Sequence, residues 1–141
     1  MATDLEKMMN DYLAATNSHD MERILFFFTD DVVYEDVALG KVNHGKKELR
    51  DFFNSFFVDI PDIKIEVKSS FGAGDWSAGE WVMSGTFAHS SIPGLAATGK
   101  SFSVRGVSIT EFRKGKISRN SDYWNMTSFL QQVGLMPPPP K

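Results

Sequence analysis

The chain has 141 residues, of which 42% are apolar and 13% aromatic, enough to bury the core of one domain. The net charge of −3, with both signs mixed, excludes the basic surface that nucleic acids or anionic membranes require. The absence of cysteine excludes disulfides, thiol nucleophiles and Cys-ligated metals. The first residues lack signal-peptide features and no apolar run approaches the ~18 residues of a membrane span, so we expect a soluble cytoplasmic protein.

The first half of the chain predicts helices around one strand. Thr3 and Glu6 form a capping box, and apolar residues then recur at helical spacing as far as Asn17. Asp20 caps a second, shorter helix. A strand of β-branched and aromatic residues and a helix with a wide apolar stripe complete this half. We place these three elements at residues 21–28, 32–37 and 46–58.

The second half predicts a run of strands. Four segments have the alternation or the β-branched and aromatic content of strands, at residues 63–69, 76–89, 102–112 and 117–124. Residues 113–116 make a tight hairpin turn, and a last helix over 126–133 stops at Gly134. We therefore expect a single domain over 1–136 and an extended, proline-rich tail over 137–141.

Helices followed by consecutive strands with short connections are typical of the α+β class. We expect a curved antiparallel sheet wrapped around the N-terminal helices, which together form a cone-shaped α+β barrel. A long sheet covered by helices on one face curls, so its concave side holds either core side chains or a cavity.

Several local strings follow the pattern of one superfamily. Residues 12–57 resemble ketosteroid isomerase, with a tyrosine on the first helix, a Thr-Asp-Asp string and then Tyr-Glu-Asp at the strand end. Residues 94–135 resemble the SnoaL-type polyketide cyclases, with the strings Val-Arg-Gly-Val and Asp-Tyr-Trp-Asn-Met. The resemblance covers nearly the whole chain and implies a nuclear-transport-factor-2-like fold. It is less specific for the reaction, because this superfamily holds isomerases, cyclases, dehydratases, hydrolases and non-catalytic binders.

Asp36 and Tyr12 are the first candidates for catalysis. Strand alternation places Val32, Tyr34 and Asp36 on one face, and burial in an apolar pocket would raise the pKa of the carboxyl group toward neutrality. The resemblance to ketosteroid isomerase implies that Asp36 is the proton-shuttling base and that Tyr12 donates a hydrogen bond to the substrate oxyanion. The alternatives are a solvated acid at the strand end and a core tyrosine.

One position departs from the isomerase pattern. Thr110 lies where the resemblance places the protonated aspartate of the oxyanion hole. A hydroxyl donates a weaker hydrogen bond than a carboxylic acid. We therefore do not expect ketosteroid isomerisation itself.

Asp122 is the second candidate base, and it alternates with Asn120 and Trp124 along the last strand. The resemblance to SnoaL-like cyclases implies that this aspartate takes a proton from carbon between carbonyls, giving an enolate for intramolecular aldol closure. The alternative is an acid bonded to the backbone or paired with Arg105 or Arg119. Two acids in one dry cavity would split their pKa values.

Further residues are candidates for substrate binding. An aromatic and Met-rich wall suits a flat apolar ligand. The candidates on the strands and helices are Thr110, Asn120, Trp124, Phe56 and Trp81, and those at the rim are His89 and His44. We expect His19 to be solvated in a turn. The three scattered histidines lack metal-ligand spacing, so we expect no metal and no cofactor.

The leading hypothesis is a cofactor-independent enzyme of the cyclase or isomerase class, which moves a proton next to a carbonyl of an apolar substrate. One alternative is a non-catalytic module for an apolar small ligand, with its acids paired to Arg105 or Arg119. The other is an assembly domain whose outer sheet face pairs two chains and whose cavity is filled by side chains. The resemblance makes a homodimer the expected state under all three hypotheses.

Overall fold

A computed structural model of the protein describes residues 4–140, so the capping box predicted at Thr3 lies outside the described residues. Ten helices and strands are formed within this range. In chain order they are α1 (Asp4–Ser18), α2 (Met21–Leu25), β1 (Phe28–Asp36), β2 (Lys41–His44), α3 (Gly45–Asp59), β3 (Lys64–Ala73), β4 (Trp76–Thr86), β5 (Ser101–Arg113), β6 (Lys116–Trp124) and α4 (Met126–Gln132). None of these helices is long and apolar enough to cross a membrane.

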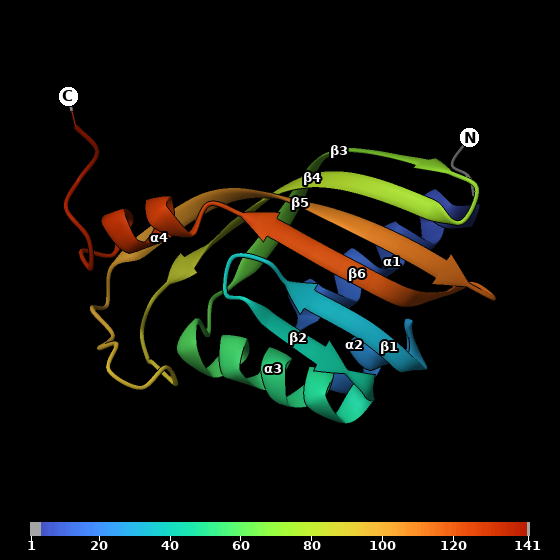
Figure 1. The fold of residues 1–141 in the computed structure, drawn as a ribbon, viewed down its shortest axis with the longest axis horizontal. Helices are drawn as coiled ribbons and strands as arrows, with labels where there is room; N and C mark the ends of the chain where they lie inside the picture. Colours follow the sequence, from blue (N-terminus) through green and yellow to red (C-terminus); the bar gives the residue numbers. More distant parts are fainter. Residues whose placement is uncertain (1–3, 141) are drawn as a thin grey trace.

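The strands form one curved sheet in the order β2-β1-β6-β5-β4-β3 (Figure 1). This confirms the predicted α+β class. Four of the five strand pairs are antiparallel, but β1 runs parallel to β6, which corrects the purely antiparallel expectation. The sheet also remains open between its edge strands β2 and β3, so the barrel is not closed.

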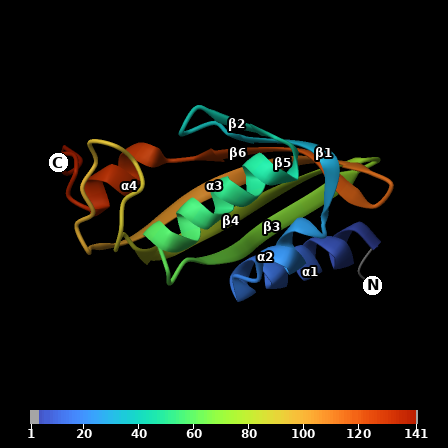
Figure 2. The same cartoon turned by 90° about the horizontal axis from the view of Figure 1, so that it is seen from below.

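The helices are distributed along the sheet. Figure 2 shows α1 and α2 beside each other on one side of the sheet. Helix α1 contacts β3, α3 contacts β1 and β2, and the short α4 packs on β5 at the far end. The sheet therefore curls around α1 and α3, and this leaves an enclosed space between helices and strands.

Two groups of buried side chains frame that space. The first joins α1, α2, α3 and β1, and its fully buried members include Ala15, Phe28, Val32 and Leu49. The second lies between the strands and α4, and it includes Met83, Phe87, Phe102 and Phe129. Burial of these apolar surfaces is the main term that holds the helices on the sheet.

Four element boundaries differ from the prediction by three residues or more, and one strand was not predicted. Strand β1 begins at Phe28 rather than at residue 32, and β3 extends to Ala73 rather than ending at residue 69. Helix α2 ends at Leu25 rather than at residue 28, because the Phe27 carbonyl accepts a hydrogen bond from the Ile117 N–H at 2.7 Å and the chain there joins the sheet. The short edge strand β2 was not predicted. Strand β4 ends at Thr86 rather than at residue 89, because the N–H groups of Ala88 and His89 donate to the Asp59 carbonyl instead.

Candidate active site

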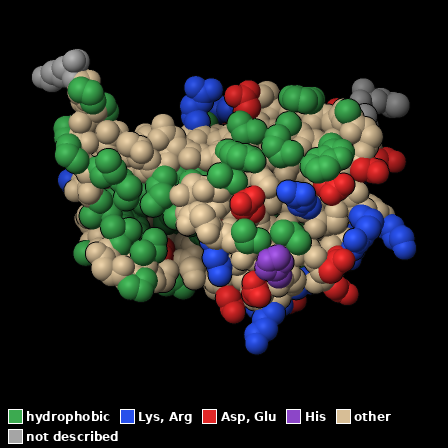
Figure 3. Space-filling view, viewed as in Figure 1, with side chains coloured by type: hydrophobic (Ala, Val, Ile, Leu, Met, Phe, Trp, Pro, Cys, Tyr) green, Lys and Arg blue, Asp and Glu red, His purple; other side chains and the backbone are tan. Residues whose placement is uncertain are grey.

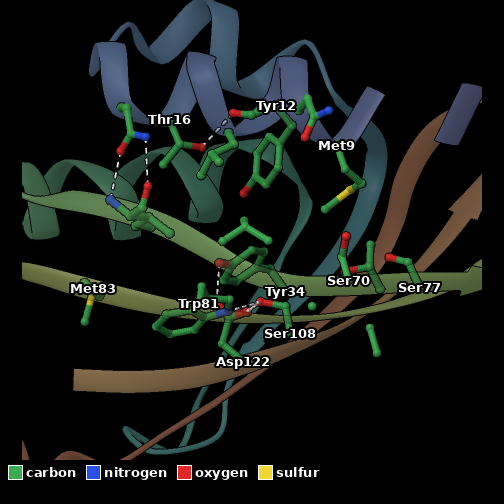
Figure 4. A pocket seen from close by; sticks show the side chains of 18 of the residues that line it. Met9, Tyr12, Thr16, Tyr34, Ser70, Ser77, Trp81, Met83, Ser108 and Asp122 are labelled. Atoms are coloured by element: carbon green, nitrogen blue, oxygen red, sulfur yellow. Dashed lines mark hydrogen bonds between the residues drawn. The ribbon is translucent and has the colours of Figure 1, made fainter. Parts of the chain in front are cut away.

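A cavity of about 380 Å³ lies between the helices and the concave face of the sheet. Its walls come from α1, α3, β1 and strands β3 to β6. Most of the lining is apolar and aromatic, including Leu5, Met9, Tyr12, Phe52, Phe53, Phe56, Phe57, Ile65, Trp81 and Met83. A hydrogen-bonded group of polar side chains, which we call the polar end, surrounds Asp122, while other polar residues such as Asn17, Ser70 and Ser77 border the cavity elsewhere (Figure 4). An apolar pocket with a few convergent polar groups is the usual form of a small-molecule site.

Asp122 lies at the centre of the polar end and accepts three side-chain hydrogen bonds. Ser108 Oγ donates to its Oδ1 atom at 2.6 Å and Asn120 Nδ2 donates to the same atom at 2.7 Å. The Tyr34 hydroxyl donates to Oδ2 (Figure 4). Burial raises the pKa of the Asp122 carboxyl group, and the three donors offset part of that rise. Asp122 is therefore a firmly oriented carboxylate in a largely apolar site.

Asp36 faces the same cavity from the neighbouring strand. It is paired with Asp122 in the parallel register of β1 and β6, and only 3% of its surface is exposed. Trp124 Nε1 lies 3.0 Å from Oδ1 and 3.1 Å from Oδ2, and the Leu39 N–H donates to Oδ1 at 2.9 Å. Burial, which outweighs these donors, raises the pKa of Asp36 to about 6. Asp36 can thus exchange a proton close to neutral pH.

Two tyrosines, Tyr12 and Tyr34, line the same cavity as these acids. Tyr12 on α1 lines the cavity and packs edge-on against Phe27 and Phe28, with ring centroids 5.8 and 5.5 Å away. Burial, followed by the charge of Asp122, raises the pKa of the Tyr12 hydroxyl. Burial also raises the pKa of Tyr34 well above its ordinary value. Both side chains therefore remain neutral hydrogen-bond donors across the physiological range.

Thr110 and Asn120 form the layer behind Asp122. Thr110 Oγ1 donates to Asn120 Oδ1 at 2.7 Å, and the amide nitrogen of Asn120 in turn donates to Asp122. Thr110 borders the cavity, whereas Asn120 is buried and is absent from its lining. The hydrogen bond to Asn120 uses the single proton of the Thr110 hydroxyl, so Thr110 orients Asn120, which in turn donates to Asp122.

The remaining predicted binding residues divide into two groups. Phe56, Trp81 and Trp124 line the cavity. His44 and His89 are exposed and do not line it. His89 follows the end of β4, so strand alternation no longer directs its side chain toward the sheet interior. His44 is the N-terminal cap of α3 and the last residue of β2. It is paired with Val33 of β1, which lies three residues before Asp36 on that strand.

His19 also differs from the prediction of a solvated turn residue. Its ring is half-buried and stacks on Phe57 with the ring centroids 4.4 Å apart. A ring nitrogen lies 2.9 Å from the Ile63 carbonyl oxygen. His19 therefore holds the turn after α1 against α3 and β3.

Two residues of the polar group, Tyr34 and Ser108, were not among the predicted site residues. Strand alternation had placed Tyr34 on the face of Asp36 and Ser108 on the face of Thr110, so each could have been found from its strand. Their contact with Asp122 depends on the pairing of β6 with both β1 and β5. Of these two pairings, only the β5–β6 hairpin is visible as a short turn in the sequence.

The charge of the lining is one-sided. Over the described part of the chain, it includes the carboxyl groups of Glu6, Asp36 and Asp122 but no lysine, arginine or histidine. Within residues 4–140, neither Asp36 nor Asp122 forms an ion pair; Arg105 instead lies 3.7 Å from Glu80. The same residues contain no group of three His, Cys, Asp or Glu side chains that could hold a metal ion. The arginine pairing expected of the non-catalytic alternative is therefore not found.

Similar proteins were found at the level of sequence and of structure. The chain is 33% identical over 123 residues to cyclase aurE from Calcarisporium arbuscula, covering 85% of this chain and 87% of that protein. TsrD from Streptomyces laurentii superimposes with a TM-score of 0.82 at 20% identity, over 94% of this chain and 96% of that one. A hypothetical protein with a ketosteroid isomerase-like fold from Catenulispora acidiphila DSM 44928, in complex with trimethylamine, gives a TM-score of 0.79 at 23% identity, over 92% and 94%.

The two structural likenesses establish the nuclear-transport-factor-2-like, ketosteroid isomerase-type fold. The family model of the SnoaL-like polyketide cyclases matches residues 6–133, which include every element from α1 to α4 apart from the first two residues of α1. The family match and the cyclase relative together support a cyclase- or isomerase-type enzyme. The chain belongs to the SnoaL-like polyketide cyclase family.

Proposed function

We propose that the protein is a cofactor-independent cyclase that closes a ring in a neutral, flat polyketide by an intramolecular aldol reaction. The observation that carries this proposal is the placement of Asp122 and Asp36 side by side at the polar end of a mostly apolar cavity. Neighbouring strands are about 4.8 Å apart, so both carboxyl groups reach one substrate. Two acids with different surroundings supply a base and an acid for a single reaction.

Asp122 acts as the base in this proposal. Its Oδ1 atom is occupied by Ser108 and Asn120, and its Oδ2 atom accepts one bond, from Tyr34, which leaves one lone pair of Oδ2 for a substrate proton. Asp122 removes a proton from a carbon between two carbonyl groups. The C–H electron pair becomes the enolate, and the Tyr12 hydroxyl donates a hydrogen bond to the enolate oxygen.

Asp36 completes the proton transfer. The enolate carbon attacks a second carbonyl carbon of the same chain, which forms the new C–C bond and moves the carbonyl π electrons onto oxygen. Asp36 in its protonated form gives that oxygen a proton. After product release Asp122 returns its proton to solvent and Asp36 regains one. A pKa of about 6 keeps a usable fraction of Asp36 protonated near neutral pH.

The lining supports a substrate without negative charge. None of the lysines, arginines and histidines that the structure describes borders the cavity, so a carboxylate would be buried beside the two aspartates without a positively charged partner. A methyl ester, lactone or ketone avoids that cost. We therefore propose that neutral esters are turned over and that the corresponding free acids are not.

Activity on a panel of aromatic and linear β-polyketone methyl esters, each with its free acid, tests this function. Mass spectrometry and NMR would detect the cyclised isomer or its dehydration product. We expect turnover of at least one ester, loss of turnover in Asp122→Asn and Asp36→Asn, and no loss in Glu35→Gln. Glu35 is the matched control because it lies next to Asp36 on β1 but points to the other face of the sheet. Equal turnover in Asp122→Asn and the native protein would refute the assigned base.

We also propose that the protein forms a homodimer through the outer face of the sheet. Hydrophobic side chains gather over the strands on this face (Figure 3). Trp76, Ile109 and Tyr123, from β4, β5 and β6, are 43%, 36% and 49% exposed. Arg105 and Glu80 add opposite charges on the same face. A surface that carries both an apolar centre and both charge signs is suited to pairing with its own copy about a two-fold axis.

A further inference from the structure

We infer that Trp81 is a positioning residue for Asp122, acting through Ser108, and that Gly106 is the residue that allows it to do so. The inference rests on the proposed role of Asp122 as the base. It concerns a line of side chains that crosses three adjacent strands of the sheet, from β4 through β5 to β6.

The hydrogen bonds along this line have only one possible direction. Trp81 Nε1 lies 2.8 Å from Ser108 Oγ, and an indole N–H is a donor only, so the Ser108 oxygen accepts. The Ser108 hydroxyl proton is then available for Asp122 Oδ1 at 2.6 Å (Figure 4). The indole thus fixes the rotation of the serine hydroxyl, and the serine in turn fixes one oxygen of the carboxylate.

Strand register explains how the indole reaches Ser108. Trp81 is paired directly with Gly106, whereas Ser108 lies two residues farther along β5 and is paired with Asp122. The indole therefore has to lie across the backbone at position 106. A Cβ atom built on Gly106 would come within 2.3 Å of Trp81 Cη2 and 2.6 Å of Cζ2, closer than real Cβ contacts. Glycine at this position makes room for the ring.

The same ring forms part of the cavity wall. A flat substrate that packs on Trp81 therefore contacts the side chain that also orients the base. The arrangement couples the position of the substrate ring to that of the Asp122 carboxylate. It predicts that Trp81 affects the proton affinity of Asp122 even when no substrate is bound.

Three variants separate the hydrogen bond from the ring. Trp81→Phe keeps an aromatic wall but removes the N–H donor. Ser108→Ala removes the link to Asp122. Gly106→Ala keeps both groups but displaces the indole. Trp76→Phe is the matched control, because Trp76 lies on the same strand but is exposed on the outer face.

The measurement is the pH titration of the Asp122 carboxyl carbon by NMR in protein labelled with ¹³C-aspartate, with Asp122→Asn used for assignment. Because the Ser108 hydrogen bond lowers the Asp122 pKa, Ser108→Ala should raise it, and Trp81→Phe and Gly106→Ala should raise it in the same direction by a smaller amount. Trp76→Phe should leave it unchanged. An Asp122 titration in Trp81→Phe that matches the native protein would overturn the inference, whatever the behaviour of Gly106→Ala.

The titration is independent of turnover, so it separates this inference from the proposed function. If the titration moves as expected and a cyclisation substrate is found, kcat/KM of Trp81→Phe should fall about 10-fold, the size expected when a hydrogen bond to a charged group is weakened. If the titration moves but Asp122→Asn keeps full turnover, the positioning line stands and the assigned base is wrong. If the titration does not move, the line is wrong even if Asp122 is the base.

Discussion

The burial of Asp36 makes a quantitative prediction about stability. Its carboxyl group has an ordinary pKa of 3.8, and burial raises the pKa to about 6 in the folded protein. The folded state therefore binds the proton more tightly than the unfolded chain. The stability that this proton contributes is fully present below pH 3.8 and is lost as the pH rises through about 6.

The size of the effect follows from the difference between the two pKa values. Each tenfold change in proton affinity corresponds to about 1.36 kcal/mol. The rise from 3.8 to about 6 thus corresponds to about 3 kcal/mol of stability that the native protein loses between acid and neutral pH. Only 3% of the Asp36 surface is exposed, so solvent screening does little to reduce this figure.

Asp36→Asn isolates this contribution because asparagine does not titrate. Asparagine puts an NH₂ group, which cannot accept a hydrogen bond, where Asp36 Oδ2 lies 3.1 Å from Trp124 Nε1, so the variant is less stable than the native protein at pH 4. Its disadvantage should shrink by about 2 kcal/mol between pH 4 and pH 8, because part of the full effect is already lost at pH 4. Urea denaturation at intervals of pH, with Glu35→Gln as the control, measures the difference. A constant difference between Asp36→Asn and the native protein from pH 4 to pH 8 would refute the reasoning.

Three further predictions concern other parts of the molecule. Tyr34→Phe keeps the ring packed against Phe53 but removes a donor to Asp122, so it should raise the Asp122 pKa and cost about 1.5–3 kcal/mol in urea denaturation at pH 8, with a smaller loss as the pH falls and Asp122 takes up a proton. Leu49→Ala leaves a cavity in the core between α1, α2, α3 and β1 and should lower the free energy of unfolding by about 2–5 kcal/mol, measured by thermal unfolding. A decrease below about 1 kcal/mol would contradict the packing described. Ile109→Arg puts a charge on the outer sheet face, so light scattering should show a monomer. Lys7→Ala on α1 should leave the protein dimeric.

Much of the fold could be predicted because local patterns specify it. The apolar stripe of residues 46–58 lies within α3, and the hairpin turn before residue 116 joins β5 to β6. Strand alternation also placed Asp36 on the cavity side of β1 and Asp122 on that side of β6. These features depend on the periodicity of single elements, which a sequence displays directly.

The pairing of β1 with β6 could not be predicted in the same way. The two strands are separated in the sequence by α3 and four other strands, and no local pattern states that they run parallel. Their pairing brings Tyr34 against Asp122 and Asp36 beside it. The polar end of the cavity is thus a product of long-range contacts, which explains why its acids were predicted and its hydrogen-bond donors Tyr34 and Ser108 were not.

The hydrogen bond from Thr110 to Asn120 has a similar origin. The position of Thr110 on β5 facing the cavity followed from alternation. The partner of its hydroxyl, Asn120, follows from the exact register of the β5–β6 pair. A shift of the hairpin by one residue would have placed Asn120 on the other face and left Thr110 free to contact a substrate.

The central claim is that Asp122 removes a proton from carbon in this cavity. Hydrogen–deuterium exchange at C1 of 2-tetralone, a flat ketone of suitable size, tests it most directly when followed by ¹H NMR in D₂O. We predict exchange faster than the uncatalysed rate with the native protein and with Glu35→Gln, and exchange at the uncatalysed rate with Asp122→Asn. Exchange by Asp122→Asn as fast as by the native protein would contradict the assignment of Asp122 as the base.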